Sequence, residues 1–408
     1  MKKYVLVGSG SRGLDAYAKP MCINYSDCAT LCGIYDTSKK RAEVVASKLP
    51  YKVEVFEDFD KMLDVVKPDT VIVTSIDATH DEYIVRALNN GCDVISEKPI
   101  TTTPEKFARI YEAEKKSGKK VTTTFNCRYM DHFERIKEIL MSGVLGEVCS
   151  VHYEWMLDRS HGADYFRRWH RNRKNSGSLL IHKSTHHFDI LNWFLDDEPE
   201  VVNAFGTRKV YGDITRKKSE RCLNCPGKND CEYFFDLTKD MGNDYIDLYL
   251  NCEDDSGYIR DKCVFSEEID IEDNVSVSIK YKKGTVVSYT LTAHTPYEGA
   301  KIVFNGTKAR VEFTVIHGGG IFGGAKSNEL KIFLPSGEVQ TIVIPGKEGT
   351  HGGSDDKLRD VLFRGSKEDP LGRAADTRAG GMSAGIGMAA NISMKENRSV
   401  RIDEIIHI

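Results

Sequence analysis

The pattern of hydrophobic and polar positions divides the chain into two parts. In the first 125 residues short β-rich runs alternate with segments of helical periodicity, and several runs are continuously apolar, as in strands buried on both faces. The expected strands lie at 3–7, 30–35, 51–56, 70–74, 93–96 and 120–125, and the expected helices include 38–48, 80–90 and 104–117. Alternation of this kind predicts right-handed βαβ units and a parallel, doubly wound sheet, so we assign residues 1–125 to one α/β domain.

The pattern changes after residue 125. A helix to about Met141 and a strand at 148–156 precede a second helix at 181–195, and from Val201 onward strands with alternating polarity dominate. Alternation predicts an antiparallel sheet with one buried face, so we assign residues 126–408 to an α+β domain. Residues from about 212 to 264 break the strand rhythm and are interpreted as an insertion. We expect the last helix, 378–395, to pack back on the first domain.

Composition narrows the class of protein. The 408 residues are 40% hydrophobic and 29% charged, as in globular proteins, and the net charge of −4 gives no basic excess to attract nucleic acid or a membrane surface. No run approaches the roughly 20 apolar residues that span a bilayer. Six of the eleven cysteines are scattered singly through the first part of the chain, which favours a reducing compartment; we therefore expect a cytoplasmic protein.

A glycine-rich turn follows the first strand and opens a helix. Its sequence is Gly8-Ser9-Gly10-Ser11-Arg12-Gly13. Such a turn lets backbone amides approach a pyrophosphate, and the helix N-terminus adds partial positive charge. Asp36 ends the second strand, where a carboxylate accepts hydrogen bonds from the adenosine ribose and repels a 2′-phosphate, which favours NAD over NADP. A structural turn with a helix-capping Asp36 is the alternative, and the βαβ context favours the dinucleotide.

Several motifs along the chain match one known family in the right order. Glu97-Lys98-Pro99 follows the fifth strand, Ser75-Ile-Asp-Ala-Thr-His80 follows the fourth, Asn126-Cys127-Arg128 lies at the domain crossover, and Asn305-Gly306-Thr307 forms a weaker match. The chain thus resembles the Gfo/Idh/MocA family of sugar and cyclitol oxidoreductases. The resemblance implies a Rossmann domain, a second domain with a large, mostly antiparallel sheet, a cleft between them, and a homodimer or homotetramer formed through the sheet. It also implies that the cofactor contacts include Ser75, His80, Glu97, Lys98 and Asn126.

The resemblance assigns chemistry to Lys98 and to the segment that ends in Asp189. In the family this lysine lies beside the nicotinamide and the reacting hydroxyl, where its cation orients the alcohol. Aligning on Asp189 places His186 on the family's catalytic histidine and His182 on its aspartate, and an i, i+4 spacing would put both on one helix face. His182 is a departure that removes a fixed negative charge. Lys183 is the remaining candidate catalytic residue of this segment.

A basic and aromatic loop precedes this segment. Arg168, Trp169 and His170 combine flat rings with forked donors, a mixture that binds sugars. The overall acidity argues against nucleic acid, while a solvated loop with Trp169 in the core stays open as an alternative. By resemblance we add Arg128, His186 and His351, which begins a His-Gly-Gly element, to the expected substrate contacts.

Three cysteines of the insertion have a spacing found at metal sites. Cys222, Cys225 and Cys231 form Cys-x2-Cys-x5-Cys, with Cys252 and Cys263 further on. Bound zinc, free thiols and a local disulfide all remain open, and hydride transfer with NAD requires no metal.

The leading interpretation is an NAD-dependent oxidoreductase that acts on a ring hydroxyl of a sugar, cyclitol or glycoside. A first alternative is an NAD-dependent glycosidase, in which transient oxidation acidifies a neighbouring C–H and permits elimination. A second is a non-catalytic cofactor-binding regulator, against which the retention of Lys98 and His186 counts.

Overall fold

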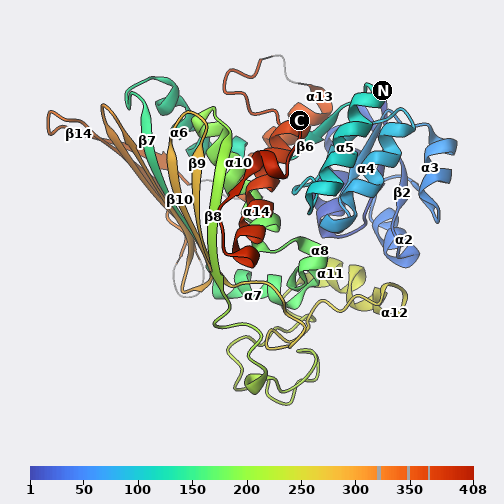
Figure 1. Ribbon diagram of the computed structural model, residues 1–408. Helices are drawn as coiled ribbons and strands as arrows, with labels where there is room; N and C mark the ends of the chain where they lie inside the picture. The colour runs from blue at the N-terminus through green and yellow to red at the C-terminus, as the bar shows by residue number, and fades with distance from the viewer. Residues whose placement is uncertain (319–322, 347–349, 366–367) are drawn as a thin grey trace.

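The computed structural model describes residues 1–318, 323–346, 350–365 and 368–408. It contains two sheets, with the order β3-β2-β1-β4-β5-β6 in the first and β14-β13-β12-β11-β7-β10-β9-β8-β15 in the second. Figure 1 shows the sheets on opposite sides of the molecule, with α14 between them. Among the described residues no helix has both the length and the apolar character needed to cross a bilayer.

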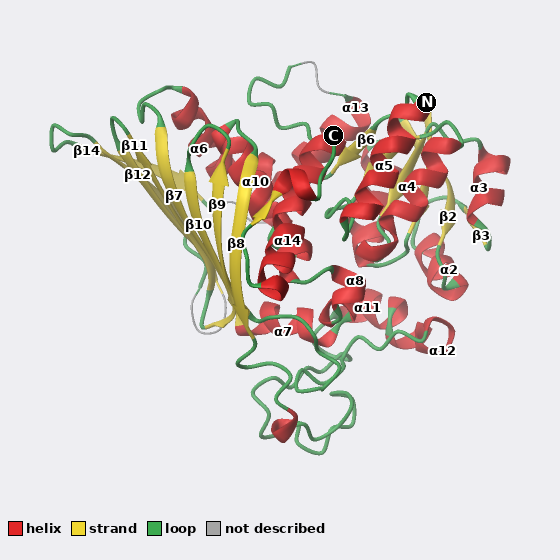
Figure 2. Cartoon of the chain, viewed as in Figure 1, coloured by secondary structure: helices red, strands yellow, loops and turns green. Residues whose placement is uncertain are grey.

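The first sheet is parallel throughout and carries helices on its faces (Figure 2). Of its two central strands, β4 is buried along its length and β1 from Tyr4 onward, in agreement with their apolar runs. The strand order of this doubly wound sheet reverses between β1 and β4, the point at which dinucleotides bind in Rossmann folds. The elements are β1 (Lys2–Val7), α1 (Lys19–Asn24), β2 (Ala29–Tyr35), α2 (Lys39–Ser47), β3 (Glu54–Phe56), α3 (Phe59–Val66), β4 (Thr70–Val73), α4 (His80–Asn89), β5 (Asp93–Ser96), α5 (Pro104–Ser117) and β6 (Val121–Thr123).

The second sheet is antiparallel except for one parallel pair, β7 with β10. Its strands alternate buried and exposed positions, as the sequence predicted. The strands are β7 (Val148–Asp158), β8 (Pro199–Thr207), β9 (Asn274–Tyr281), β10 (Val286–Thr295), β11 (Glu298–Gly306), β12 (Arg310–Gly318), β13 (Ser327–Phe333), β14 (Val339–Pro345) and β15 (Val400–Arg401).

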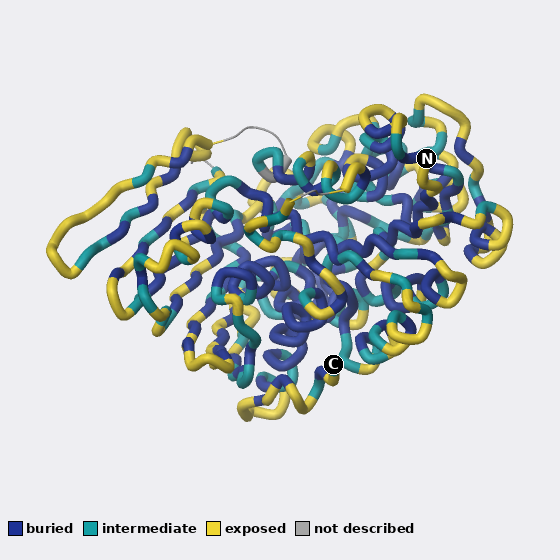
Figure 3. The backbone as a smooth tube through the Cα atoms, turned by 90° about the horizontal axis from the view of Figure 1, so that it is seen from above, coloured by how far each residue is buried: buried dark blue, intermediate teal, exposed yellow. Residues whose placement is uncertain are grey.

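The helices of the second part lie between the two sheets or beside them. The last of them, α14, is buried over most of its length, and Figure 3 shows that buried residues are concentrated in the middle of the molecule. Just before it, the amide of Thr123 at the edge of the first sheet donates to the carbonyl of Ala375 over 3.0 Å. These helices are α6 (Asp131–Met141), α7 (Arg159–Arg167), α8 (Arg173–Ser176), α9 (Leu179–His182), α10 (Thr185–Leu195), α11 (Gly242–Leu248), α12 (Glu253–Ser256), α13 (Ser354–Arg364) and α14 (Thr377–Glu396).

The prediction of one continuous helix at 181–195 is wrong. It is divided into α9 and α10, because the amide of Ser184 donates to Leu179 over 2.8 Å and closes a wider turn than an α-helix has. The Ser184 hydroxyl is fixed by that of Tyr289 at 2.9 Å. His182 and His186 therefore lie on two short helices and not on one helix face.

The insertion packs against the first domain beside α2. Lys48 of the first domain pairs with Asp244 and Asp247 at 2.9 Å each, and Lys40 pairs with Asp254 at 3.0 Å. Figure 1 shows α11 and α12 below α2.

Candidate active site

A cavity of about 600 Å³ lies where the first domain, the segment from α7 to α10 and the insertion meet. It brings together most of the predicted site residues. Its lining includes Gly8, Gly10, Ser11, Arg12, Asp36, Ser75, His80, Glu97, Lys98, Asn126, Arg168, Trp169, His170, His182, Lys183 and His186.

The glycine-rich turn packs against the end of β4 and against itself too closely to accept side chains. Gly8 has φ +94°, and a Cβ atom there would lie 2.6 Å from the amide nitrogen of Ser75. A Cβ at Gly13 would lie 2.4 Å from the Gly8 carbonyl oxygen, so Gly13 serves the packing of the turn against the helix that follows. Ser9 is fully buried beneath the turn, and its amide donates to Asp36.

Asp36 is held by three donors at the end of β2. Its carboxylate accepts from the amides of Ser9 at 2.6 Å and Ser38 at 2.8 Å, and from Arg41 Nη2 at 2.9 Å. The carboxylate therefore faces the cavity in a fixed orientation, and Arg41 is the cation nearest to it.

Glu97 anchors the start of the Glu-Lys-Pro motif. Its Oε1 accepts from Arg12 Nε at 2.7 Å and from the Tyr17 hydroxyl at 2.6 Å. Burial raises the pKa of Glu97, but Arg12 and Tyr17 more than offset burial, so the pKa is lowered and the carboxylate stays charged. His80 is buried, and its ring nitrogens lie within hydrogen-bond distance of two carbonyl oxygens, Nδ1 at 2.8 Å from that of Pro99 and Nε2 at 3.1 Å from that of Ser75. Both side chains thus brace the backbone on either side of Lys98.

Lys98 projects into the cavity and reaches across to the second domain. Its Nζ donates to the carbonyl oxygen of His182 over 3.1 Å. Burial lowers the pKa of Lys98 to about 8, against the opposing effect of the carboxylates of Asp77 and Glu97. A lysine with this pKa gains or loses a proton near neutral pH, which suits a group that acts on a hydroxyl.

A carboxyl group lies beside His182, although His182 itself stands where the family has an aspartate. Its Nδ1 lies 2.6 Å from Asp77 Oδ2, which comes from the Ser75–His80 motif of the first domain. Burial raises the pKa of Asp77 and lowers that of His182, and so opposes charge on both partners. The first domain therefore supplies a carboxyl group beside the position where the resemblance expects an aspartate, in a setting that disfavours its negative charge.

The basic and aromatic loop forms one wall of the cavity. Trp169 is half-buried and stacks on His170, with 3.7 Å between ring centroids, so the alternative of Trp169 hidden in the core does not hold. The His170 ring lies 4.1 Å from that of His182. Burial lowers the pKa of His170 and leaves it neutral, while Arg168 is fixed by Asp164 at 2.9 Å.

His186 and Lys183 complete the wall beside Lys98. The buried ring of His186 packs edge-on against Phe125, with 6.1 Å between centroids. Lys183 Nζ lies 5.0 Å from the ring centre of Trp155. Burial alone would lower the pKa of Lys183, but Tyr165 and Glu298 raise it overall, so Lys183 is a lasting cation.

Arg128 does not belong to the site. It is absent from the described lining of the cavity, and its Nε and Nη2 bind the Asp189 carboxylate at 2.8 and 2.6 Å. Its Nη1 donates to the carbonyls of Gly372 and Ala374. Arg128 thus joins three segments of the second domain, and its expected contact with substrate is replaced by a structural role. The side chain of His351 lies outside the described residues.

Several lining residues escaped the sequence analysis. Asp77 lies inside a motif that was recognised, but nothing in the sequence pairs it with His182, 105 residues away. Asp355 of α13 accepts from Asn126 Nδ2 at 2.9 Å and from Arg12, and an acid after a Gly-Gly pair was its only signal. Tyr249 of the insertion accepts from the Ser11 amide at 2.9 Å, and no sequence signal indicated it.

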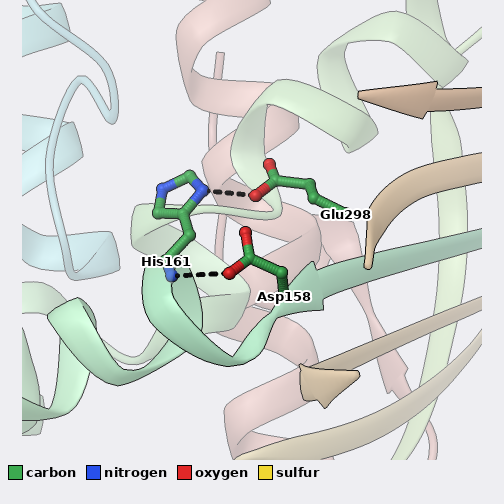
Figure 4. Close-up of side chains that lie close together, drawn as sticks. All are labelled: Asp158, His161 and Glu298. Carbon is green, nitrogen blue, oxygen red and sulfur yellow. Dashed lines mark hydrogen bonds and ion pairs between the residues drawn. The ribbon is translucent and has the colours of Figure 1, made fainter. Parts of the chain in front are cut away.

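The cysteines of the insertion do not form a metal centre among the described residues. All eleven are free thiols, and no three of their sulfur atoms converge as metal ligands. The one described group of potential ligands that does converge consists of Asp158, His161 and Glu298, outside the cysteine motif (Figure 4).

Comparison with known proteins agrees with this geometry. The model of an oxidoreductase family with an NAD-binding Rossmann fold, named for Gfo, Idh and MocA, matches residues 2–125. The C-terminal α/β domain of the same family matches residues 137–402.

Individual proteins that are similar in sequence or structure extend the comparison. The chain is 38% identical to YteT of Bacillus subtilis (strain 168), whose name describes it provisionally as an oxidoreductase. The match covers 100% of this chain and 99% of the length of YteT. An inositol 2-dehydrogenase of Serratia proteamaculans (strain 568) is 26% identical over 61% of this chain and 67% of its own. A levoglucosan dehydrogenase solved with NADH and levoglucosan shares the fold, with a TM-score of 0.68 and 18% identity over 98% of this chain and 99% of that one. The chain belongs to the Gfo/Idh/MocA oxidoreductase family and is an NAD-dependent oxidoreductase.

Proposed function

We propose that the protein transfers a hydride between nicotinamide and a ring hydroxyl of a sugar, cyclitol or glycoside. The observation that carries this proposal is the meeting of Lys98, His186 and the Trp169 loop in the cavity that the glycine turn opens. Aromatic rings bind the C–H faces of a sugar and forked donors bind its hydroxyls, while Lys98 and His186 supply the proton chemistry.

The residues present fit a dinucleotide. The Gly8 position leaves no room for a side chain, and Asn126 Oδ1 is buried without a partner in the described part of the chain, so an acceptor is available beside Lys98. When bound, NAD supplies the hydride acceptor. Lys98 orients the alcohol and stabilises negative charge on its oxygen, His186 takes the proton, and the Asp77–His182 pair holds Lys98 through the His182 carbonyl.

The test is turnover of a carbohydrate panel, followed by NADH absorbance together with the mass of the product. Oxidation gives one NADH and a product lighter by two hydrogens. Release of an aglycone without net NADH would instead identify the NAD-dependent glycosidase. Absence of turnover with every sugar, despite cofactor binding, would contradict the enzyme and favour a regulator.

Asp36 is proposed to favour NAD over NADP. Asp36→Ala removes the carboxylate and frees Arg41, now paired with it at 2.9 Å, to meet a 2′-phosphate. A charged hydrogen bond contributes about 1.5–3 kcal/mol, so we expect the ratio of kcat/KM for NAD to that for NADP to fall about 10- to 100-fold. Steady-state kinetics with both cofactors measure the ratio, and an unchanged ratio would remove the assignment.

We also propose a carbohydrate as the only class of partner besides the cofactor and further copies of this chain, with no nucleic acid or membrane. Assembly would use the face of the large sheet that α14 leaves uncovered, where Phe205 and Val286 expose apolar side chains. A cytoplasmic location is proposed from the free thiols that the cysteine pattern favours.

A further inference from the structure

A chain of hydrogen bonds leads from the large sheet to the wall of the cavity. Glu298 Oε2, at the start of β11, lies 2.6 Å from His161 Nδ1, and His161 Nε2 lies 3.0 Å from the Tyr165 hydroxyl (Figure 4 shows the first contact). His161 and Tyr165 stand one turn apart on α7, with their rings stacked at 5.2 Å. Both side chains line the cavity, and no role in the proposed chemistry has yet been given to them.

Asp158, His161 and Glu298, whose potential ligand atoms converge, are better suited to hydrogen bonding than to binding a metal ion. Asp158 caps α7, because its Oδ1 accepts from the amides of Ser160 at 2.7 Å and His161 at 3.3 Å. The positive charge of Lys183 already acts on Glu298 and lowers the pKa of that carboxyl group. The His161 Nδ1 that a metal would need is already engaged by Glu298.

The carboxylate determines which nitrogen of His161 carries the proton. Burial raises the pKa of Glu298, but the hydrogen bond from His161 and the charge of Lys183 lower it to about 2, so Glu298 is ionised at working pH. An ionised carboxylate only accepts, so neutral His161 donates from Nδ1. His161 Nε2 is then an acceptor, and the Tyr165 hydroxyl must donate to it. The oxygen of Tyr165 consequently offers the cavity lone pairs and no proton.

We propose that Tyr165 is a specificity-determining contact that accepts a hydrogen bond from a substrate hydroxyl next to the reacting carbon, with Glu298 and His161 as its positioning residues. This inference rests on the proposed carbohydrate substrate. An acceptor that cannot donate binds a hydroxyl and rejects a methyl ether or a missing oxygen at that place, since the buried tyrosine oxygen would then be left unpaired.

Protonation of His161 reverses this polarity. Its Nε2–H then donates to Tyr165, whose own proton turns toward the cavity, and the preference for a donor is lost. Charged and titratable groups from several elements surround the Glu298–His161–Tyr165 hydrogen bonds. They are Asp158, Asp164, Arg168, His170, His182, Lys183 and His317.

The first experiment compares a turned-over sugar with its singly deoxygenated and O-methylated analogues. At pH 8, wild type should disfavour the analogue altered at the Tyr165-bound position about 10- to 100-fold in kcat/KM, the effect of one unpaired buried group. Tyr165→Phe should abolish this discrimination and change KM far more than kcat. Glu298→Gln should relax it as well, because a neutral amide no longer fixes the tautomer. Full discrimination in both variants would overturn the inference.

The second experiment does not depend on the substrate. Nitrogen-15 NMR of labelled histidine should show neutral His161 protonated at Nδ1 in wild type, and a mixture of tautomers in Glu298→Gln. In the first experiment, His161→Gln should also relax the discrimination, because the ring nitrogen that holds the Tyr165 proton is then gone. His152→Gln is the matched control, since exposed His152 bonds Ser288 on the sheet, away from the cavity.

The outcomes separate the two proposals. A panel that yields no sugar substrate contradicts the proposed function, while the NMR result can still show the fixed tautomer. Turnover without a Tyr165-dependent preference, or an Nε2–H tautomer in wild type, contradicts the inference and leaves the proposed function intact.

Discussion

Replacing Lys98 by alanine is expected to lower kcat by about 10²- to 10⁴-fold, the range found for groups that act on the transferred proton and on charge in the transition state. The ammonium group is buried, its pKa is about 8, and it lies 3.1 Å from the His182 carbonyl oxygen in the wall of the cavity. In low dielectric a single positive charge stabilises a developing alkoxide strongly, and water that fills the space cannot replace it. Pre-steady-state and steady-state NADH formation measure the loss.

The control for Lys98→Ala is Lys116→Ala, which removes an exposed lysine from α5. It should retain wild-type kcat. Titration of intrinsic fluorescence with NADH should show that Lys98→Ala still binds the cofactor, because the glycine turn is untouched. Wild-type kcat in Lys98→Ala would contradict the assigned chemistry.

Arg128→Ala is expected to destabilise the second domain by about 3–5 kcal/mol, the cost of breaking a buried ion pair by removing one partner. Asp189 is fully buried and depends on the two hydrogen bonds from Arg128, at 2.6 and 2.8 Å. The substitution also leaves the carbonyls of Gly372 and Ala374 without the Nη1 donor. Urea denaturation followed by tryptophan fluorescence measures the free energy of unfolding.

Two variants accompany this measurement. Arg135→Ala removes a solvent-exposed arginine from α6, which pairs with Glu138 at 2.7 Å, and should change stability by less than about 1 kcal/mol. Arg128→Ala combined with Asp189→Ala should recover part of the loss, since no carboxylate is then buried alone. A strong fall in sugar affinity at unchanged stability would restore Arg128 to the substrate site.

The sequence was sufficient for the parts of the fold that depend on local pattern. α5 begins and ends at the expected residues, because Thr103 caps it, Pro104 suits its first turn, and Gly118 takes the left-handed conformation at its end. The division of the helix around Lys183 was not predicted: the amide of Ser184 closes a wider turn on Leu179, and its hydroxyl is held by Tyr289, which lies 105 residues away. Local periodicity carries no information about such a partner.

The same distinction between local pattern and long-range contact explains which residues of the candidate site were predicted and which were missed. Lys98, His186 and the glycine turn were found because each lies in a local motif with its own geometry. The carboxylate opposite His182 was missed because Asp77 belongs to the other domain, and Arg128 was misplaced because its partner Asp189 follows 61 residues later. Pairings across the chain decide both cases, and a single sequence does not contain them.

The insertion places one of its own side chains on the glycine-rich turn. Tyr249 holds the Ser11 amide, one of the donors that a pyrophosphate needs, and the Lys48 and Lys40 ion pairs fasten α11 and α12 to the first domain. A pyrophosphate that bonds the Ser11 amide would have to take the place of the tyrosine hydroxyl, so the cofactor and the insertion compete for one donor.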